Sequence, residues 1–102
     1  SMGTASYVLV GAEGAMRETF GSVCHGAGRL MSRTAAKKGR TVQQVQQALE
    51  EQGIFVKSET RDGILEEIPE AYKDVDAVIE VVHNAGLARK VARLRPMGVI
   101  KG

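Results

Sequence analysis

The sequence predicts a mixed α/β fold of the α+β type, in which short strands and three to four helices form one unit. Two segments, 41–53 and 74–86, begin at a capping residue, keep apolar residues at helical spacing and end at glycine. Two short apolar runs, 6–10 and 54–57, are typical of strands. No internal repeat, low-complexity stretch or Pro-rich linker divides the chain, so we expect a single unit spanning residues 1–102.

The first half of the chain is predicted as a strand, a helix, a loop and two further helices. The strand at 6–10 is closed by Gly11, a short helix covers about 13–20, and the glycine-rich tract 21–28 is a loop. Residues 30–38 are compatible with a helix. Thr41 with Gln44 three residues later is a capping-box pattern. The helix that follows ends at Gly53 and keeps one apolar face, made of Val42, Val45, Ala48 and Leu49.

The second half begins with the strand at 54–57, and the polar residues 58–63 are predicted to form an exposed turn. Pro69 then stands in an irregular or helix-starting segment that presents Tyr72. Asp74 is a good N-cap for the next helix. The apolar stripe of that helix is formed by Val75, Val78, Ile79 and Val82.

The last segment alternates basic and apolar residues after Gly86, which predicts extended structure. Just before it, His83 falls in the last helical turn, where a cation favours the helix dipole. A flexible tail is one interpretation of the last six residues, but Val99 and Ile100 can be buried, and their burial would aim Lys101 at a fixed point.

Composition limits the classes of protein that fit. The hydrophobic fraction is 43% but aromatic residues make up only 4%, so we expect a core of Val, Leu, Ile, Ala and Met, with part of the apolar surface serving as an interface. The single Cys24 excludes an internal disulfide, and one cysteine with two histidines cannot close a metal site within this chain. No run approaches the roughly 20 residues of a membrane span and no signal peptide is evident, so we expect a cytoplasmic protein without a membrane partner.

The net charge of +2 is small, and the distribution of charge is more informative. Arg29, Arg33 and Lys37 recur every four residues, which on a helix forms one basic stripe that starts beside a histidine. We expect Arg29 and Arg33 to contact phosphate or the RNA backbone. A second basic cluster at 89–95 is equally compatible with a solvated face.

The tract Cys24-His25-Gly26-Ala27-Gly28-Arg29 has the composition of a phosphate-binding loop. Glycines let backbone N–H groups approach an anion, and an arginine provides a planar fork for phosphate oxygens. The His25 imidazole could attack a nucleotide phosphorus and carry the nucleotide as a phosphoramidate. A turn histidine with no catalytic role is the alternative, because glycine clusters are commonly just turns.

Further motifs accompany this tract: Ser-Met-Gly-Thr at 1–4, Ser-Tyr-Val-Leu-Val-Gly at 6–11, Thr-Phe-Gly-Ser at 19–22 and a terminal Lys-Gly. Together they resemble the C-terminal part of the RtcB-type RNA-splicing ligases, over essentially the whole chain. The resemblance implies the C-terminal unit of that family's fold. It also implies a GTP- and manganese-dependent tRNA-splicing ligase that joins RNA 3′-phosphate or 2′,3′-cyclic phosphate ends to 5′-hydroxyl ends, as in RNA repair.

The same resemblance implies roles for individual residues. His25 matches the histidine that GTP guanylylates. The residues implied to line or border the guanylate site are Ser1, Met2, Ser6, Gly26, Ala27 and Gly28, with Tyr72 and Lys101 reaching the guanine.

The family's enzymes are several times longer, and their manganese ligands lie N-terminal to the matching segment. The chain therefore looks like a fragment that needs the N-terminal part of the same ligase and is inactive alone. Ser1 is compatible with the junction left by a protein-splicing element or with an arbitrary boundary. Two other classes stay open, a non-catalytic nucleotide- or RNA-binding module and a structural interaction protein.

Overall fold

The computed structural model describes residues 2–102, which form short strands and helices of the predicted α+β class. The strands are β1 (Ser6–Gly11), β2 (Phe55–Ser58), β3 (Ala88–Leu94) and β4 (Gly98–Lys101). The helices are α1 (Glu13–Glu18), α2 (Arg33–Ala36), α3 (Val42–Glu51), α4 (Arg61–Glu66) and α5 (Val75–Asn84), with a 3-10 turn at Pro69–Ala71. The described residues thus contain five α-helices, one more than the upper end of the expected three to four.

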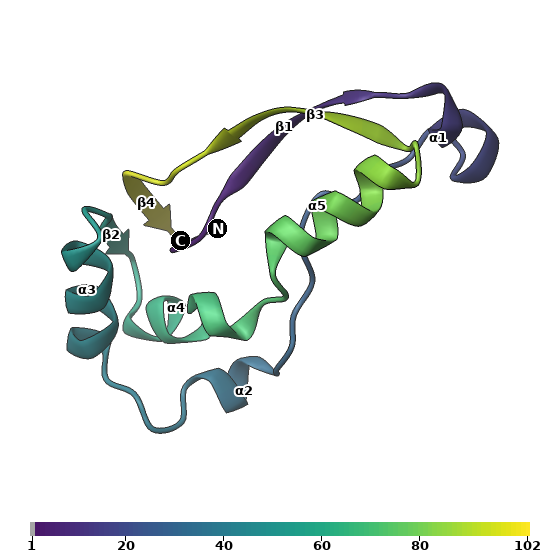
Figure 1. Ribbon diagram of the computed structural model, residues 1–102. Helices are drawn as coiled ribbons and strands as arrows, with labels where there is room; N and C mark the ends of the chain where they lie inside the picture. Colours follow the sequence, from purple (N-terminus) through teal and green to yellow (C-terminus); the bar gives the residue numbers. More distant parts are fainter. Residues whose placement is uncertain (1) are drawn as a thin grey trace.

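One end of the elongated molecule, which measures 45 × 26 × 21 Å, is built on an antiparallel ribbon of β1 and β3. Ser6 pairs with Leu94 and Gly11 with Ala88, and the register shifts between Val8 and Leu9. Figure 1 shows α5 lying along one face of this ribbon. The carboxylate of Asp76 on α5 accepts hydrogen bonds from the Tyr7 hydroxyl (2.5 Å) and from Arg93 (2.9 and 3.1 Å), which ties the helix to both strands.

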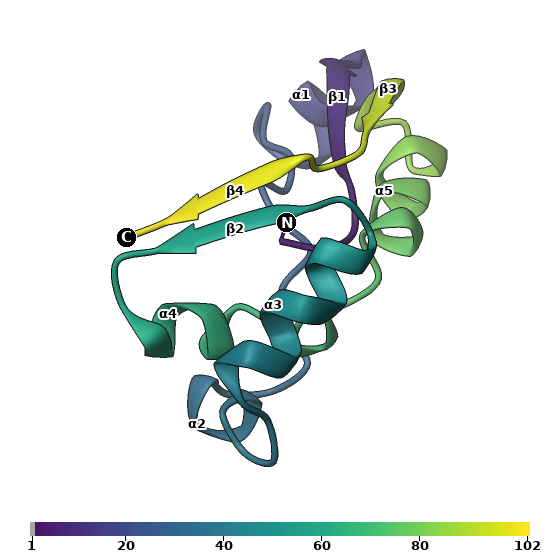
Figure 2. The ribbon, with the colours of Figure 1, turned by 90° about the vertical axis from the view of Figure 1, so that its left-hand side faces the viewer.

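The other end contains the parallel pair of β2 and β4, in which Phe55 pairs with Gly98 and Ser58 with Lys101. Figure 2 shows these two strands side by side, with α3 packed against them. A small aliphatic core fills this end, as the composition predicted. Its buried members are Met2, Ala36, Val45, Leu49, Ile54, Ile64, Ile68 and Ala71.

Both predicted helix starts are confirmed. Thr41 Oγ1 accepts from the Gln44 amide (3.2 Å) while the Gln44 side chain accepts from the Thr41 amide (3.0 Å), a complete capping box. Asp74 caps α5 by accepting from the Asp76 amide (2.9 Å). Within the predicted stripe of α5, Ile79 and Val82 are buried.

Two local predictions were wrong because contacts distant in sequence determine the backbone. Residues 30–38 are helical only in α2, since the Leu30 amide donates to the Ala71 carbonyl (2.7 Å) and Arg29 forms a bridge with Tyr72. The predicted turn at 58–63 contains the start of α4, where Thr60 Oγ1 accepts from the Gly63 amide (3.1 Å). Thr60 is therefore an N-cap whose signal was masked by polar neighbours.

The helix expected at 13–20 ends at Glu18, and Phe20 adopts a left-handed backbone (φ 54°) with its side chain 97% exposed. His83 lies in the last turn of α5 as expected, but its Nδ1 accepts from the Lys90 amide (3.2 Å). This contact links the end of α5 to β3.

The burial expected for Ile100 is wrong. Val99 packs against the core, whereas Ile100 is 86% exposed, because successive residues of a strand face opposite sides.

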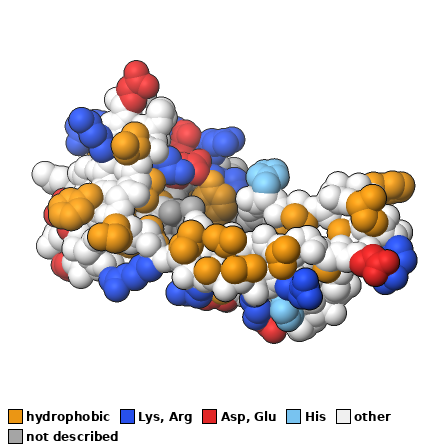
Figure 3. Space-filling view, turned by 90° about the horizontal axis from the view of Figure 1, so that it is seen from above, with side chains coloured by type: hydrophobic (Ala, Val, Ile, Leu, Met, Phe, Trp, Pro, Cys, Tyr) orange, Lys and Arg blue, Asp and Glu red, His pale blue; other side chains and the backbone are white. Residues whose placement is uncertain are grey.

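Exposed apolar residues also cover the outer face of the β1/β3 ribbon, where Figure 3 shows them gathered in a row. They are Val8, Val10, Val91 and Leu94. Among the described residues, none of the helices has the length and apolar character needed to cross a membrane.

Candidate functional site

A cavity of about 290 Å³ lies between β1, the loop that carries His25, the segment 67–79 and the end of β4. Most of the residues predicted for the guanylate site line it, although they come from segments far apart in the sequence. These are Met2, Ser6, His25, Gly26, Ala27, Tyr72 and Lys101. Gly28 lies at the end of the same loop and Ser1 lies outside the described residues. The volume is near the lower end of the range for small-molecule sites, about 300–1,000 Å³.

The His25 loop is fixed at both of its ends. Before it, Gly21 adopts φ +72° and its amide donates to the Ala15 carbonyl of α1 (2.8 Å). After it, Gly28 adopts φ +80°, a conformation that favours glycine, and its carbonyl accepts from the Lys73 amide (2.9 Å). Between these anchors His25 is exposed and its imidazole has no hydrogen-bond partner within residues 2–102. A ligand in the cavity therefore has direct access to the imidazole.

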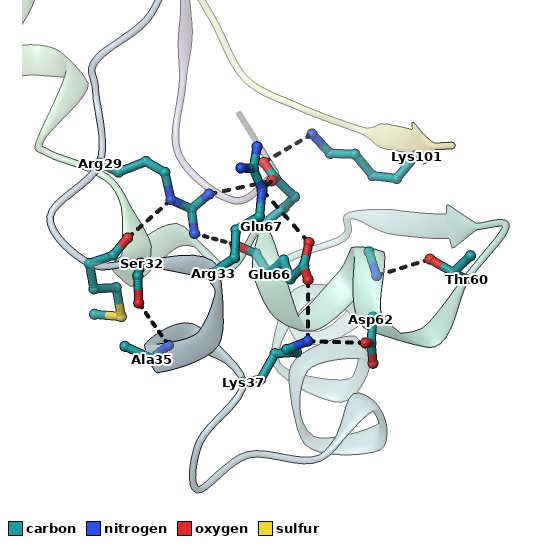
Figure 4. Close-up of polar contacts among 12 residues, drawn as sticks. Arg29, Ser32, Arg33, Ala35, Lys37, Thr60, Asp62, Glu66, Glu67 and Lys101 are labelled. Carbon is teal, nitrogen blue, oxygen red and sulfur yellow. Dashed lines mark hydrogen bonds and ion pairs between the residues drawn. The ribbon is translucent and has the colours of Figure 1, made fainter.

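The floor beside the loop is a hydrogen-bonded network around the Glu67 carboxylate (Figure 4). Glu67 accepts from the Tyr72 hydroxyl and from Arg29 Nη1 (3.3 Å), and it lies 3.8 Å from Lys101 Nζ. Arg29 also donates to Tyr72 Oη (3.0 Å), and its guanidinium carbon is 4.9 Å from the Tyr72 ring centroid. The network thus fixes both residues that were expected to reach the guanine, Tyr72 and Lys101.

The charges of this network shift its two titratable acids in opposite directions. Partial burial raises the pKa of Glu67, but the Tyr72 hydrogen bond and the positive charges of Lys101, Arg29 and Arg33 outweigh burial, so the pKa lies below its usual 4.5. The pKa of Tyr72 is raised above 10.0 by burial and by its hydrogen bond to Glu67. At neutral pH the pair is therefore a carboxylate that accepts from a protonated phenol.

The predicted basic stripe faces acidic side chains. Arg33 lies 3.7 Å from Glu66 and 3.9 Å from Glu67, and Lys37 bonds Asp62 at 3.1 Å. The Arg29 side chain, 22% exposed, also donates to the Met31 (3.0 Å) and Glu66 (2.6 Å) carbonyls. In this arrangement Arg29 connects the His25 loop to α4, and Arg33, 65% exposed, keeps a free face toward solvent.

Sequence reasoning missed two charged residues that line the cavity, Glu67 and Lys73. Glu67 lies within an acidic stretch that is typical of a solvated surface, and its partners Arg29 and Lys101 lie 38 and 34 positions away. Lys73 directly follows Tyr72, so its proximity to an expected site residue was the one available signal.

The residues near His25 suit an anionic group, because Gly26, the loop backbone and two lysines border the cavity. They do not suit a metal by themselves. Within residues 2–102 no group of three or more His, Cys, Asp or Glu side chains is arranged to hold a metal ion, and Cys24 is an exposed free thiol.

Comparison with known proteins covers the whole chain. A family profile described as tRNA-splicing ligase RtcB matches residues 1–102. The chain belongs to the RtcB family. RtcB relatives described as tRNA-splicing ligases include those of Thermococcus kodakarensis, 59% identical over 102 residues, and Nanoarchaeum equitans, 58% identical over the same length. All of this chain is matched in both, but it spans only 21% of each relative. The relative from Pyrococcus abyssi is 56% identical, and the chain spans 11% of it.

Proposed function

We propose that this chain is the C-terminal, guanylate-carrying part of a GTP- and manganese-dependent RNA ligase of the cytoplasm. The complete enzyme would join RNA 3′-phosphate or 2′,3′-cyclic phosphate ends to 5′-hydroxyl ends, in tRNA splicing and RNA repair. The observation that carries the proposal is that His25, Gly26, Ala27, Tyr72 and Lys101 line one and the same cavity. Membership of a family described as tRNA-splicing ligases supports it.

In this proposal an imidazole nitrogen of His25 attacks the α-phosphorus of GTP. A P–N bond forms, the bond to the β-phosphate oxygen breaks, and pyrophosphate leaves. The Gly26–Gly28 backbone borders the phosphate, and Ser1 and Ser6 line the guanylate site. Met2, 2% exposed, contributes an apolar wall. Tyr72 and Lys101 meet the guanine. The RNA 3′-phosphate oxygen then attacks the same phosphorus and releases His25.

For the RNA we propose different roles for the two arginines that were expected to bind phosphate. Arg33 is about two-thirds exposed and has only long ion pairs of 3.7 and 3.9 Å, so it can turn toward an RNA phosphate. Arg29 donates to two carbonyls, a carboxylate and a phenol, so its role is to hold the loop in place.

The N-terminal part of the ligase is the proposed partner of this chain. It would supply the manganese ligands that residues 2–102 lack, and manganese would neutralise negative charge on the triphosphate during attack. It would also cover exposed apolar side chains such as Phe20 (97% exposed) and Phe55 (74%). We therefore expect the isolated chain to show no guanylylation above background.

The proposal is tested by incubating the complete ligase and its His25→Ala variant with Mn²⁺ and GTP labelled at the α-phosphate. We expect the unaltered protein to form an adduct that is stable to alkali and released by acid, as for a phosphoramidate, and the variant to form none. An adduct at unchanged yield in the variant would place the nucleophile elsewhere.

A second candidate function is a non-catalytic nucleotide-binding module. It is favoured by the lack of any hydrogen-bond partner for the His25 imidazole within residues 2–102, since an activated nucleophile commonly has an orienting group. Reversible GTP binding by the complete protein, with no covalent adduct under any metal condition, would support this module instead.

A further inference from the structure

Two lysines line the cavity, Lys73 and Lys101, and within residues 2–102 only Lys101 has an acidic partner. Lys101 Nζ lies 3.8 Å from the Glu67 carboxylate. Lys73 makes no ion pair or side-chain hydrogen bond within residues 2–102. The nearby Arg29 directs its donors to protein acceptors. Lys73 is thus the cavity cation whose charge is not matched by this part of the protein.

The position of Lys73 relative to the His25 loop is fixed by its backbone. The Lys73 amide donates to the Gly28 carbonyl (2.9 Å), and the neighbouring Leu30 amide donates to the Ala71 carbonyl (2.7 Å). The Lys73 side chain runs beside the end of the loop, because its Cδ and Cε lie 3.9 and 4.0 Å from the point where a Cβ on Gly28 would stand. The end of the Lys73 stem therefore lies beside Gly28, and the residue lines the cavity.

Lys73 can reach a bound phosphate, whereas Arg29 is held by its hydrogen bonds to protein acceptors. An ammonium on a flexible four-carbon stem is a mobile point charge that follows a phosphate as its geometry changes, and it loses no ion pair in doing so. Loop amides and a lysine together are a recurrent way of holding phosphate. A solvated lysine with no role is the alternative, since the residue is exposed.

We propose that Lys73 binds a phosphate group at the His25 site, in the first place the phosphates of the bound nucleotide. The inference rests on the proposed function and adds to it a phosphate-binding residue that the sequence analysis did not identify. The RNA 3′-phosphate presents the same chemistry to the same ammonium, and the experiment separates the two sources.

The test uses the complete ligase with Lys73→Gln, Lys73→Arg and, as a matched control, Lys38→Gln, an exposed lysine outside the cavity. Affinities for GTP and for guanosine are measured in a His25→Ala background, which prevents covalent capture. Lys73→Gln should weaken GTP binding roughly 10- to 100-fold, as for one charge-assisted hydrogen bond, and leave guanosine binding unchanged. Lys73→Arg should recover most of the loss, and Lys38→Gln should change neither affinity.

A second measurement follows RNA joining in a single turnover by protein that already carries GMP. Unchanged GTP affinity with joining slowed at least tenfold by Lys73→Gln would assign the contact to the RNA phosphate. Values within twofold of the unaltered protein in both assays would overturn the proposal. Equal losses for GTP and guanosine would also overturn it, because they indicate a structural role. Since reversible binding does not depend on the covalent step, an adduct that survived His25→Ala would refute the proposed function and leave this result standing.

Discussion

Replacing Glu67 by glutamine removes the negative charge at the centre of the cavity network and nearly preserves its shape. The carboxylate accepts from Tyr72 and Arg29 and attracts Lys101, and its side chain is only 20% exposed. A hydrogen bond to a charged group contributes about 1.5–3 kcal/mol. Glutamine still offers one carbonyl acceptor, and Arg29 keeps its bonds to two backbone carbonyls. We therefore expect a local destabilisation of about 1–2 kcal/mol.

Hydrogen exchange of the Leu30 and Lys73 amides measures this change directly, because both amides bond across the junction between the His25 loop and residues 71–73. Their opening free energy should fall by about 1–2 kcal/mol in Glu67→Gln. The matched control is Glu66→Gln, which removes a negative charge from the adjacent residue and leaves the hydrogen bond of Tyr72 in place. We expect it to change the opening free energy by less than about 1 kcal/mol. A Tyr72→Phe variant completes a double-mutant cycle.

The effect also has a defined pH dependence. Because the folded pKa of Glu67 is lowered below 4.5, its contribution is fully present above that value and is lost as pH falls through the lowered pKa. The difference between the unaltered protein and Glu67→Gln should thus be constant near neutrality and shrink on acidification below about 4.5. Opening energies that agree within about 0.3 kcal/mol at pH 7, or a coupling near zero between positions 67 and 72, would refute the network as described.

Three further changes test other parts of the structure. Lys101→Ala in the complete ligase should weaken GTP use by about 1.5–3 kcal/mol and narrow the preference for GTP over ATP. Both effects are measured as guanylylation rates with GTP and with ATP. An unchanged GTP rate with an unchanged GTP:ATP ratio would show that Lys101 is a solvated residue without a role in binding. Gly14→Ala should destabilise the 102-residue chain by about 1–3 kcal/mol in urea unfolding, although alanine ordinarily favours helices, because its Cβ would stand 2.3 Å from the Gly86 carbonyl oxygen. Gly11→Ala, which meets nothing within 4 Å, is the control, and equal effects would contradict the clash. Thr41→Ala should lower stability by about 1 kcal/mol through loss of the capping box, against less than about 0.5 for Thr34→Ala on the exposed side of α2.

The sequence by itself determined the elements whose signals are local. Thr41 and Gln44 define the start of α3, and Asp74 defines the start of α5, because a capping hydrogen bond spans only two or three residues. The glycine-rich tract around His25 was identified as a loop because its glycine content is also a local signal. The motifs also indicated the family, which the comparison confirmed over the whole chain. The roles of the individual site residues are still predictions.

Tertiary structure alone decided which charges meet. The stripe of Arg29, Arg33 and Lys37 looks free in sequence, yet all three side chains face acids of α4 and the residue after it, 25 to 38 positions away. The same packing limits the helix expected within 30–38 to α2, pairs the preceding Arg29 with Tyr72 in a β-bridge, and places Glu67 and Lys73 in the cavity wall. Such contacts depend on how whole elements pack, and an ion pair leaves no periodic trace along the chain. For that reason only the folded molecule reveals that Lys73 has no acidic partner within residues 2–102.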